Sequence, residues 1–256
     1  DVKTGGKHTI EHPVYAVSPD GRTAVAPDFR RINDMRPGYG YCGLPDPHAD
    51  ELAPDDSGIF RIDLETGTRE LIVSLAQVAA VPYPIADLGR KKHYFNHLLV
   101  SPDGKRFEFL HRWAPRDKVD CRTRMFTAAM DGSDLWVVDH SGCTSHFIWR
   151  DAGHILAWSW YPGRHGSPHG HQGGFCLFED KPDGGNVEII GGKQMFNDGH
   201  CVYLPGNEWI VNDTYPDRRR ERTLFLYQVA TGKIVVLGRF YNAPEYTGEW
   251  RVDLHP

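Results

Sequence analysis

The 256-residue sequence lacks several of the signals that assign a protein to a common class. No apolar run is long enough for a helix that crosses a membrane, so we expect no membrane span. No stretch has the period of a long amphipathic helix, so we do not expect a mainly helical fold. The formal net charge of −5 shows no excess of basic residues, which argues against non-specific binding of nucleic acid.

Two motifs of common enzymes are also missing. The sequence contains no Gly-x-Ser-x-Gly turn that would present a nucleophilic serine, and no glycine-rich phosphate loop after a strand. The cysteines are odd in number and form no Cys-x-x-Cys pair, which favours reduced thiols over a disulfide framework. Reduced thiols fit the cytoplasm, and a periplasmic location stays open. The five cysteines are Cys42, Cys121, Cys143, Cys176 and Cys201.

Glycine and proline are frequent, and 12% of the residues are aromatic, which suits many short strands joined by turns. A pattern of a histidine, a short apolar strand, a tight turn and a second strand recurs along the chain. Its histidines are His97, His146, His200 and His255, which lie 49, 54 and 55 residues apart. A repeat of this length, with several short strands in each unit, is typical of β-propeller blades.

We therefore predict an all-β fold in which residues 1–256 form a single, partial β-propeller. The expected blades cover residues 10–75, 93–141, 145–191 and 197–241, and a fifth begins near residue 250. The chain starts at Asp1 rather than at a methionine and stops inside the repeat, so we expect a piece of a longer protein with a larger ring. Residues 28–57 form a long insertion in the first unit, and long loops of this kind often carry function.

The recurring histidines are the first candidates for chemistry. The first strand of a propeller blade lines the central channel, so His97, His146, His200 and His255 converge if each lies on that strand. Imidazoles together with a carboxylate suit Mn, Fe or Zn. Asp253 lies two residues before His255 and faces the same side of a strand, so these two and His200 form a candidate set of metal ligands. The alternative is a structural hydrogen bond between neighbouring blades.

Other side chains near these strands are candidates for substrate contacts. Four arginines flank the predicted channel strands and could pair with a carboxylate or bridge two blades: Arg112, Arg122, Arg124 and Arg251. Trp113 is one of several tryptophans that could stack on a sugar ring or fill the core. A loop with three further histidines allows a second metal site, but its Gly- and Ser-rich composition favours a mobile surface loop. These histidines are His165, His169 and His171.

Four segments resemble the oligogalacturonate lyase group of seven-bladed β-propellers: residues 96–109, 145–158, 198–216 and 249–256. The resemblance implies a ring of seven blades and elimination from a uronate, with His146 as the base. It also implies that Arg122 or Arg124 assists the base. The metal ligands implied for manganese are His200, Asp253 and His255. The sequence departs from the family at Asp253, where a histidine is expected, and at Trp250, where a glutamine is expected.

We therefore expect a metal-dependent lyase that acts on acidic, uronate-containing oligosaccharides such as pectin fragments. Its catalytic residues would be His146, Arg122 and Arg124. Its cofactor would be a divalent cation, with manganese first and zinc or iron as alternatives. Substrate contacts would come from His97, Arg112, Trp113 and Arg251. The alternative is a non-catalytic β-propeller that binds glycans or protein partners, and a glycoside hydrolase with paired carboxylates also stays open.

Overall fold

The structure is a computed structural model that describes residues 3–84, 87–114, 123–161, 173–192 and 194–256. Within these residues the chain forms four antiparallel sheets, each of four strands. Every sheet consists of strands that follow one another directly along the chain. This confirms the predicted all-β fold with about four propeller blades.

The sheets are numbered in chain order. Sheet 1 contains β1 (Ala16–Val17), β2 (Thr23–Pro27), β3 (Gly58–Asp63) and β4 (Arg69–Ser74). Sheet 2 contains β5 (Lys92–Val100), β6 (Arg106–Ala114), β7 (Thr123–Ala129) and β8 (Trp136–Gly142). Sheet 3 contains β9 (Phe147–Asp151), β10 (His154–Trp160), β11 (Gly173–Glu179) and β12 (Glu188–Ile190). Sheet 4 contains β13 (Val202–Tyr203), β14 (Trp209–Asn212), β15 (Glu221–Gln228) and β16 (Ile234–Tyr241).

Helices are short and lie in the connections. They are α1 (Phe29–Met35), α2 (Leu75–Ala79) and the 3-10 turns η1 (Pro182–Gly184) and η2 (Gly248–Trp250). No helix among the described residues is long and apolar enough to cross a membrane.

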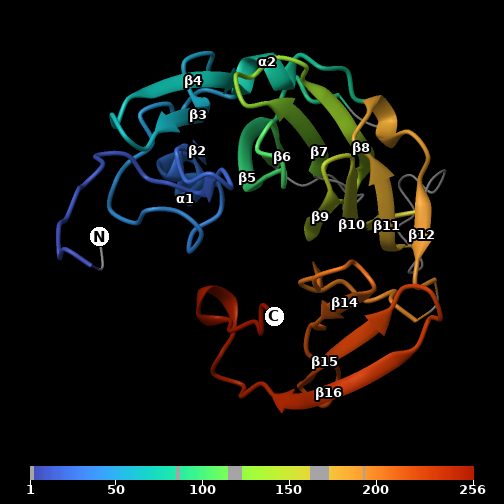
Figure 1. Cartoon of the computed structure of the whole chain (residues 1–256). Helices are drawn as coiled ribbons and strands as arrows, with labels where there is room; N and C mark the ends of the chain where they lie inside the picture. Colours follow the sequence, from blue (N-terminus) through green and yellow to red (C-terminus); the bar gives the residue numbers. More distant parts are fainter. Residues whose placement is uncertain (1–2, 85–86, 115–122, 162–172, 193) are drawn as a thin grey trace.

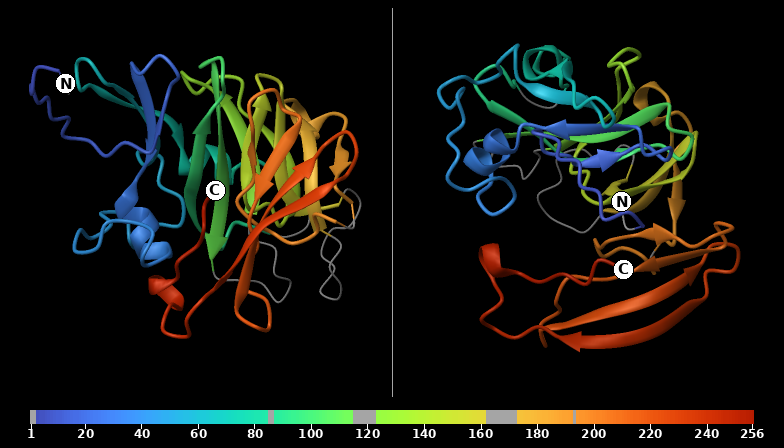
Figure 2. Two further views of the ribbon diagram at one scale, coloured as in Figure 1. Left: turned by 60° about the horizontal axis from the view of Figure 1, so that its bottom comes forward. Right: turned by 60° about the vertical axis from the view of Figure 1, so that its left-hand side comes forward.

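The four sheets follow one another around a common centre, and the ring is open between sheet 1 and sheet 4 (Figure 1). The two further views show the sheets standing side by side, each twisted against the next (Figure 2). After β16 the chain runs back, so that its last residues lie at the centre of the ring (Figure 1). The start of the chain, in contrast, lies at the outer edge of the ring (Figure 1).

The Ser-Pro-Asp-Gly turns explain why the first two strands of a unit form a hairpin. In sheet 1 the Ser18 hydroxyl donates to Asp20 at 2.6 Å, and Gly21 takes a φ of +72°. In sheet 2 the Ser101 hydroxyl donates to Asp103 at 2.7 Å, and Gly104 again has a φ of +72°. Glycine adopts this left-handed conformation at little cost, so the same four residues produce the same turn twice.

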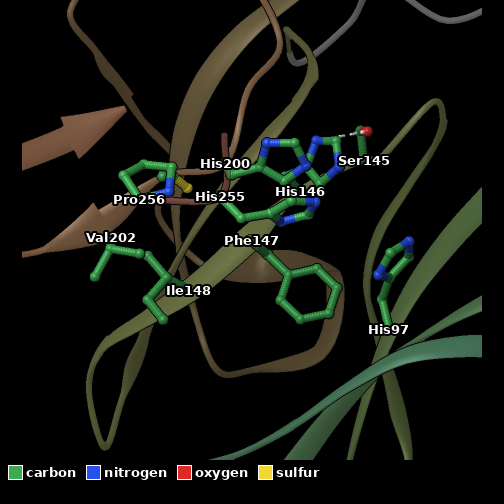
Figure 3. A pocket seen from close by; sticks show the side chains of 10 residues that line it. His97, Ser145, His146, Phe147, Ile148, His200, Val202, His255 and Pro256 are labelled. Atoms are coloured by element: carbon green, nitrogen blue, oxygen red, sulfur yellow. Dashed lines mark hydrogen bonds between the residues drawn. The ribbon is translucent and has the colours of Figure 1, made fainter. Parts of the chain in front are cut away.

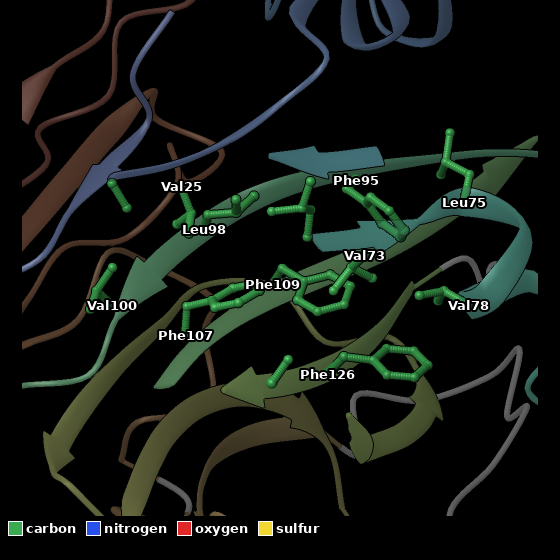
Figure 4. Packing of buried hydrophobic residues seen from close by; sticks show 13 residues of the cluster. Val25, Val73, Leu75, Val78, Phe95, Leu98, Val100, Phe107, Phe109 and Phe126 are labelled. Atoms are coloured by element: carbon green, nitrogen blue, oxygen red, sulfur yellow. The ribbon is translucent and has the colours of Figure 1, made fainter. Parts of the chain in front are cut away.

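Each pair of neighbouring sheets encloses its own apolar core. Between sheets 1 and 2 the aromatic rings of sheet 2 pack against aliphatic side chains of sheet 1 and α2 (Figure 4). This core includes Val25, Ile59, Val73, Leu75, Phe95, Phe107, Phe109 and Phe126. Separate clusters lie between sheets 2 and 3 and between sheets 3 and 4. The alternation of side chains along each strand produces these cores, because every second residue faces the adjacent sheet.

The long insertion between β2 and β3 is ordered by one buried arginine. Arg31 of α1 is only 2% exposed, and its guanidinium donates to the Asp46 carboxylate at 3.1 Å. It also donates to four backbone carbonyls, those of His48, Glu51, Leu52 and His93. These bonds satisfy a charge that burial would otherwise penalise. They attach the insertion to the start of β5.

Glu108 of β6 is a buried acid without a counter-charge at hydrogen-bond distance. It is 0% exposed, and neither carboxyl oxygen has a hydrogen-bond partner among the described residues. Burial raises the pKa of Glu108 well above its usual value, and the charge of Asp180 adds to this. Folded Glu108 therefore keeps its proton to a higher pH than Glu108 in the unfolded chain does. The contribution of this residue to stability is present at low pH and is lost as the pH rises towards its pKa in the folded protein.

We expect Glu108→Gln to remove this dependence because glutamine does not titrate. The free energy of unfolding of the variant, minus that of the parent chain, should increase as the pH is raised from 4 to 7. Urea unfolding at fixed pH values measures the difference. Glu188→Gln, on the exposed strand β12, serves as the control. A Glu108→Gln difference that is independent of pH would contradict the prediction.

Candidate functional site

Four histidines meet at the centre of the ring. The ring centroids of His97 and His146 are 5.9 Å apart, those of His146 and His200 are 4.2 Å apart, and those of His200 and His255 are 3.7 Å apart. Together they line one cavity, in which the last three cluster and His97 lies to one side (Figure 3). The repeated histidines are therefore neighbours in space although the first and last are 158 residues apart in the sequence.

Local backbone features aim these side chains at the centre. His97 sits at a bulge in β5, where the register shifts between Asn96 and Leu99, and its φ is +50°. His146 extends sheet 3 just before β9, because its carbonyl accepts from the backbone N–H of Trp158 at 2.9 Å. A bulge with a left-handed residue other than glycine is costly, and such strain concentrates at functional sites.

Gly199 lets Asp213 approach His200. A Cβ at position 199 would lie 1.9 Å from the Asp213 carbonyl oxygen, so only glycine fits there. The backbone N–H of His200 donates to Asp213 Oδ1 at 2.6 Å, and its ring Nδ1 lies 2.9 Å from the same carboxylate. These hydrogen bonds lower the pKa of Asp213 below its usual value although burial alone raises it. With Nδ1–H donated to Asp213, the lone pair of His200 Nε2 points into the cavity.

His200, Asp253 and His255 form a candidate metal centre. One ligand atom from each lies within 4.8 Å of the other two. Two ligand atoms bonded to one ion at about 2.1 Å are at most about 4.2 Å apart. A small movement of the three side chains would therefore let all of them bind one ion. Burial, with the nearby charge of His200, lowers the pKa of His255, which keeps its nitrogen available to a cation. Two imidazoles and a carboxylate suit manganese, zinc or iron, so the residues fit a divalent cation.

Asp253 is held in place by two arginines. It forms ion pairs with Arg222 and with Arg251, the latter at 2.9 Å. Burial raises the pKa of Asp253. The hydrogen bond from Arg222 and the charge of Arg251 lower this pKa by more than burial raises it, so that it lies below the usual value. The carboxylate is therefore ionised and fixed in orientation. Each of its oxygens keeps a further lone pair for a cation.

We expect Asp213→Asn to weaken binding of a divalent cation by about 10- to 100-fold, because the carboxylate that orients a ligand histidine is lost. Titration of the metal-free protein with Mn²⁺, followed by calorimetry, measures the dissociation constant. Asp217→Asn, an exposed turn residue near the start of β15, is the control. Unchanged affinity in Asp213→Asn would show that the Asp213 carboxylate does not orient a metal ligand.

His146 has the arrangement of a general base. Its Nδ1 lies 2.9 Å from Asp198 Oδ1, and the Ser145 hydroxyl donates to the other oxygen of Asp198 at 2.7 Å. The carboxylate fixes the tautomer in which Nδ1 carries the proton and Nε2 is unprotonated. Nε2 faces the cavity, where Tyr215 Oη lies 3.5 Å away. An imidazole held in this way can accept a proton from a bound molecule.

The four histidines also line a second chamber, separate from the cavity drawn in Figure 3, and three arginines lie in its wall. The chamber, of about 110 Å³, is lined by the histidines and by Arg36, Arg112 and Arg251, among other residues. Burial lowers the pKa of Arg112, and its Nε has no hydrogen-bond partner among the described residues. Burial, with the charges of Arg112 and His146, also lowers the pKa of His97 well below its usual range. A larger chamber of about 570 Å³ adjoins and shares Arg36 and Arg112. The site is therefore suited to an anion.

The insertion contributes two residues to this wall. Arg36 stacks on the ring of Tyr39 at 3.7 Å, and the Tyr39 hydroxyl accepts from Arg251 at 3.4 Å. Arg251 lies at 4.9 Å from the ring centroid of Tyr215. Cations alternate with aromatic rings, so the insertion and the C-terminal segment close one side of the cavity together.

Arg124 lies away from the four histidines. It is 0% exposed in β7, and its guanidinium donates to His111 Nδ1 at 3.3 Å and to three carbonyl oxygens. The carbonyls are those of Val78, Val81 and Pro82. These contacts attach β7 to α2 and to the segment that follows it. Arg122, the other predicted assistant of the base, lies outside the described residues.

Trp113 also lies away from the cavity. It is 1% exposed and packs against Tyr83 and His111, with ring centroids 5.1 and 5.4 Å away. The remaining predicted substrate contacts, His97, Arg112 and Arg251, line the cavity. The predicted loop histidines His165, His169 and His171 lie outside the described residues.

Sequence reasoning missed five polar residues that complete the site: Arg36, Tyr39, Asp198, Asp213 and Tyr215. Three of them lie within the 198–216 segment that contains His200. The sequence could have pointed to these three residues, because several polar residues lie close to a recurring histidine in this segment. Asp198 and Tyr215 both meet His146, which belongs to another unit, so spacing alone does not reveal these pairs.

No family model and no curated protein matches the sequence. Solved structures with a similar fold include the tricorn protease, with a TM-score of 0.58 and 12% identity over 93% of this chain and 24% of that one. The putative TolB from Agrobacterium tumefaciens has a TM-score of 0.50 and 16% identity over 88% of this chain and 64% of that one. An oligogalacturonate lyase in complex with manganese has a TM-score of 0.48 and 15% identity over 77% and 52%.

The chain thus spans less than two thirds of the length of each of these three proteins. At such identities the likeness concerns the fold alone. The chain shares the β-propeller fold, and its chemistry has to be argued from its own residues.

Proposed function

We propose that the protein is a lyase that cleaves uronate-containing oligosaccharides by β-elimination, with His146 as the general base. The observation that carries the proposal is the oriented imidazole of His146 in a cavity whose wall contains three guanidinium groups. A neutral base next to a group of fixed cations is the combination that abstraction of a proton beside a carboxylate requires.

The residues divide the task between them. Arg112 and Arg251 pair with the uronate carboxylate, which lowers the energy of the enolate-like transition state. His146 Nε2 removes the proton at C5, next to that carboxylate, and Asp198 stabilises the imidazolium that results. The bond from C4 to the glycosidic oxygen then breaks and leaves an unsaturated uronate. A divalent cation on His200, Asp253 and His255 would add positive charge that stabilises the same carboxylate.

The experiment incubates the protein with 4-linked uronate oligomers in the presence of Mn²⁺. We use oligomers of galacturonate, guluronate, glucuronate and mannuronate, and follow the ultraviolet absorbance of the unsaturated product. The proposal predicts a steady increase with at least one oligomer, and a marked reduction when a chelator is added. The acidic oligosaccharide is the proposed partner.

The alternative is a non-catalytic propeller that binds glycans. It predicts binding of an oligomer, measured by calorimetry, without any unsaturated product. Absence of product with all four oligomers at saturating Mn²⁺ would therefore refute the lyase, and binding without product would favour the alternative.

A further inference from the structure

Tyr215 stands next to the proposed base and has no role in the mechanism so far. Its hydroxyl oxygen is 3.5 Å from Nε2 of His146, the nitrogen that accepts the proton. Its ring contacts those of both His146 and His200, with centroids 6.0 and 6.1 Å away. The residue lines the same cavity as the histidines. At 3.5 Å the hydrogen bond to His146 is long, so a substrate oxygen can compete for the hydroxyl proton.

We propose that Tyr215 is the general acid of the elimination, and that it acts with His146 on a single face of the uronate ring. The inference rests on the proposed lyase function and extends it to the stereochemistry of the substrate. Its basis is the short distance between the two groups.

The distance decides which face each group can reach. Elimination removes the hydrogen on C5 and the oxygen on C4, which lie on the same face of the ring or on opposite faces. If they lie on opposite faces, the sugar ring has to stand between base and acid. Two atoms that contact a sugar ring from its opposite faces are about 7 Å apart. Nε2 of His146 and Oη of Tyr215, at 3.5 Å, leave no room for a ring between them.

The proton transfers then form a closed cycle. His146 Nε2 takes the proton from C5, and the electrons of that C–H bond form the C4–C5 double bond. The bond between C4 and oxygen breaks, its electron pair stays on the oxygen, and Tyr215 gives its proton to that oxygen. The tyrosinate is reprotonated by the imidazolium of His146, which lies beside it. Both groups return to their starting states, and no other reactant is needed.

The substrate class follows from this geometry. In 4-linked glucuronate and mannuronate the hydrogen on C5 and the oxygen on C4 lie on the same face of the ring. In galacturonate and guluronate they lie on opposite faces. The site therefore prefers glucuronate or mannuronate units, with the three arginines of the wall around the carboxylate.

The first test compares the four oligomers at equal concentration of reducing ends. We expect kcat/KM for the glucuronate or mannuronate oligomer to exceed that for galacturonate and guluronate by at least about 100-fold, the usual contribution of a placed acid–base group. Equal rates on both classes, or a preference for galacturonate or guluronate, would overturn the inference and leave the lyase function intact.

The second test separates an acid from a residue that only supports the site. Tyr215→Phe keeps the ring but removes the proton, and we expect it to lower kcat on the preferred oligomer by about 100-fold or more. On a synthetic uronate with 4-nitrophenolate at C4, which leaves without a proton, the loss should shrink to a few-fold. Tyr241→Phe, on the exposed strand β16, is the control.

Two outcomes of the second test count against the inference. Equal losses on both leaving groups would make Tyr215 a structural residue, and a loss of less than threefold on the oligomer would exclude it as the acid. If none of the four oligomers is cleaved by the parent chain, the lyase function itself fails, and the inference falls with it.

Discussion

Replacement of His146 by glutamine will lower kcat/KM for uronate cleavage by about 1,000-fold, within the range that general bases contribute. Glutamine keeps a polar group of similar length but cannot accept a proton at neutral pH. The change should affect kcat rather than KM, because the arginines of the cavity wall still bind the carboxylate. The absorbance assay over a range of oligomer concentrations measures both constants.

A matched control is available in the same sheet. His154 of β10 forms an ion pair with Asp151 at 2.8 Å and is not among the residues that line the cavity. His154→Gln should leave both constants within twofold of the parent values. If His146→Gln retains more than a tenth of the parental kcat, the base is a different residue.

Acidification from pH 7 to pH 4 will remove a stabilising contribution of His93 of about 3 kcal/mol, at 1.36 kcal/mol per unit of pKa, which is opposite in sign to the contribution of Glu108. His93 is 2% exposed, and burial lowers its pKa to about 4 from the usual 6.5. The unfolded chain therefore takes up a proton at a higher pH than the folded chain. The stabilising contribution is present above pH 6.5 and is lost as the pH falls towards 4.

The hydrogen bonds around His93 give the physical reason. Arg124 donates to His111 Nδ1, so His111 Nε2 carries a proton and donates to His93 Nδ1 at 2.8 Å. His93 Nε2 in turn donates to the Leu88 carbonyl at 3.2 Å. One set of neutral tautomers satisfies the whole chain of donors and acceptors. A further proton on His93 Nδ1 would face the N–H of His111, and no acceptor is left for it.

Urea unfolding at several pH values tests this directly. His93→Asn should be less stable than the parent chain at pH 7, because the hydrogen bonds are lost, but should lose less stability on acidification. His8→Asn, at an exposed position, is the control. The same acid dependence in the parent chain and in His93→Asn would contradict the low pKa of His93.

The parts of the fold that could be predicted are those with local signals. The Ser-Pro-Asp-Gly turns have the same sequence in two units, an apolar strand follows each of them, and the same serine-to-aspartate hydrogen bond forms in both. The helix α1 and the ordering of the insertion were not predicted. Arg31 holds that segment through backbone carbonyls. Every residue has such a carbonyl, so no sequence pattern predicts these contacts.

The convergence of the histidines follows from their recurrence, and the proximity of His200, Asp253 and His255 agrees with their spacing. Strand alternation explains the two residues that lie elsewhere. Arg112 faces the cavity, so its neighbour Trp113 must face the opposite side of the sheet. Arg124 pairs in register with His111 and shares the side of Trp113. Register between strands depends on long-range pairing, which a single sequence does not show.

The first and last contributors to the cavity, Arg36 and His255, are separated by almost the whole described chain. On the ribosome, the sheets can therefore fold while the cavity still lacks part of its lining. For the same reason a single proteolytic cut between β16 and Arg251 would leave every sheet intact but would separate Arg251, Asp253 and His255 from the chain that supplies the rest of the cavity lining.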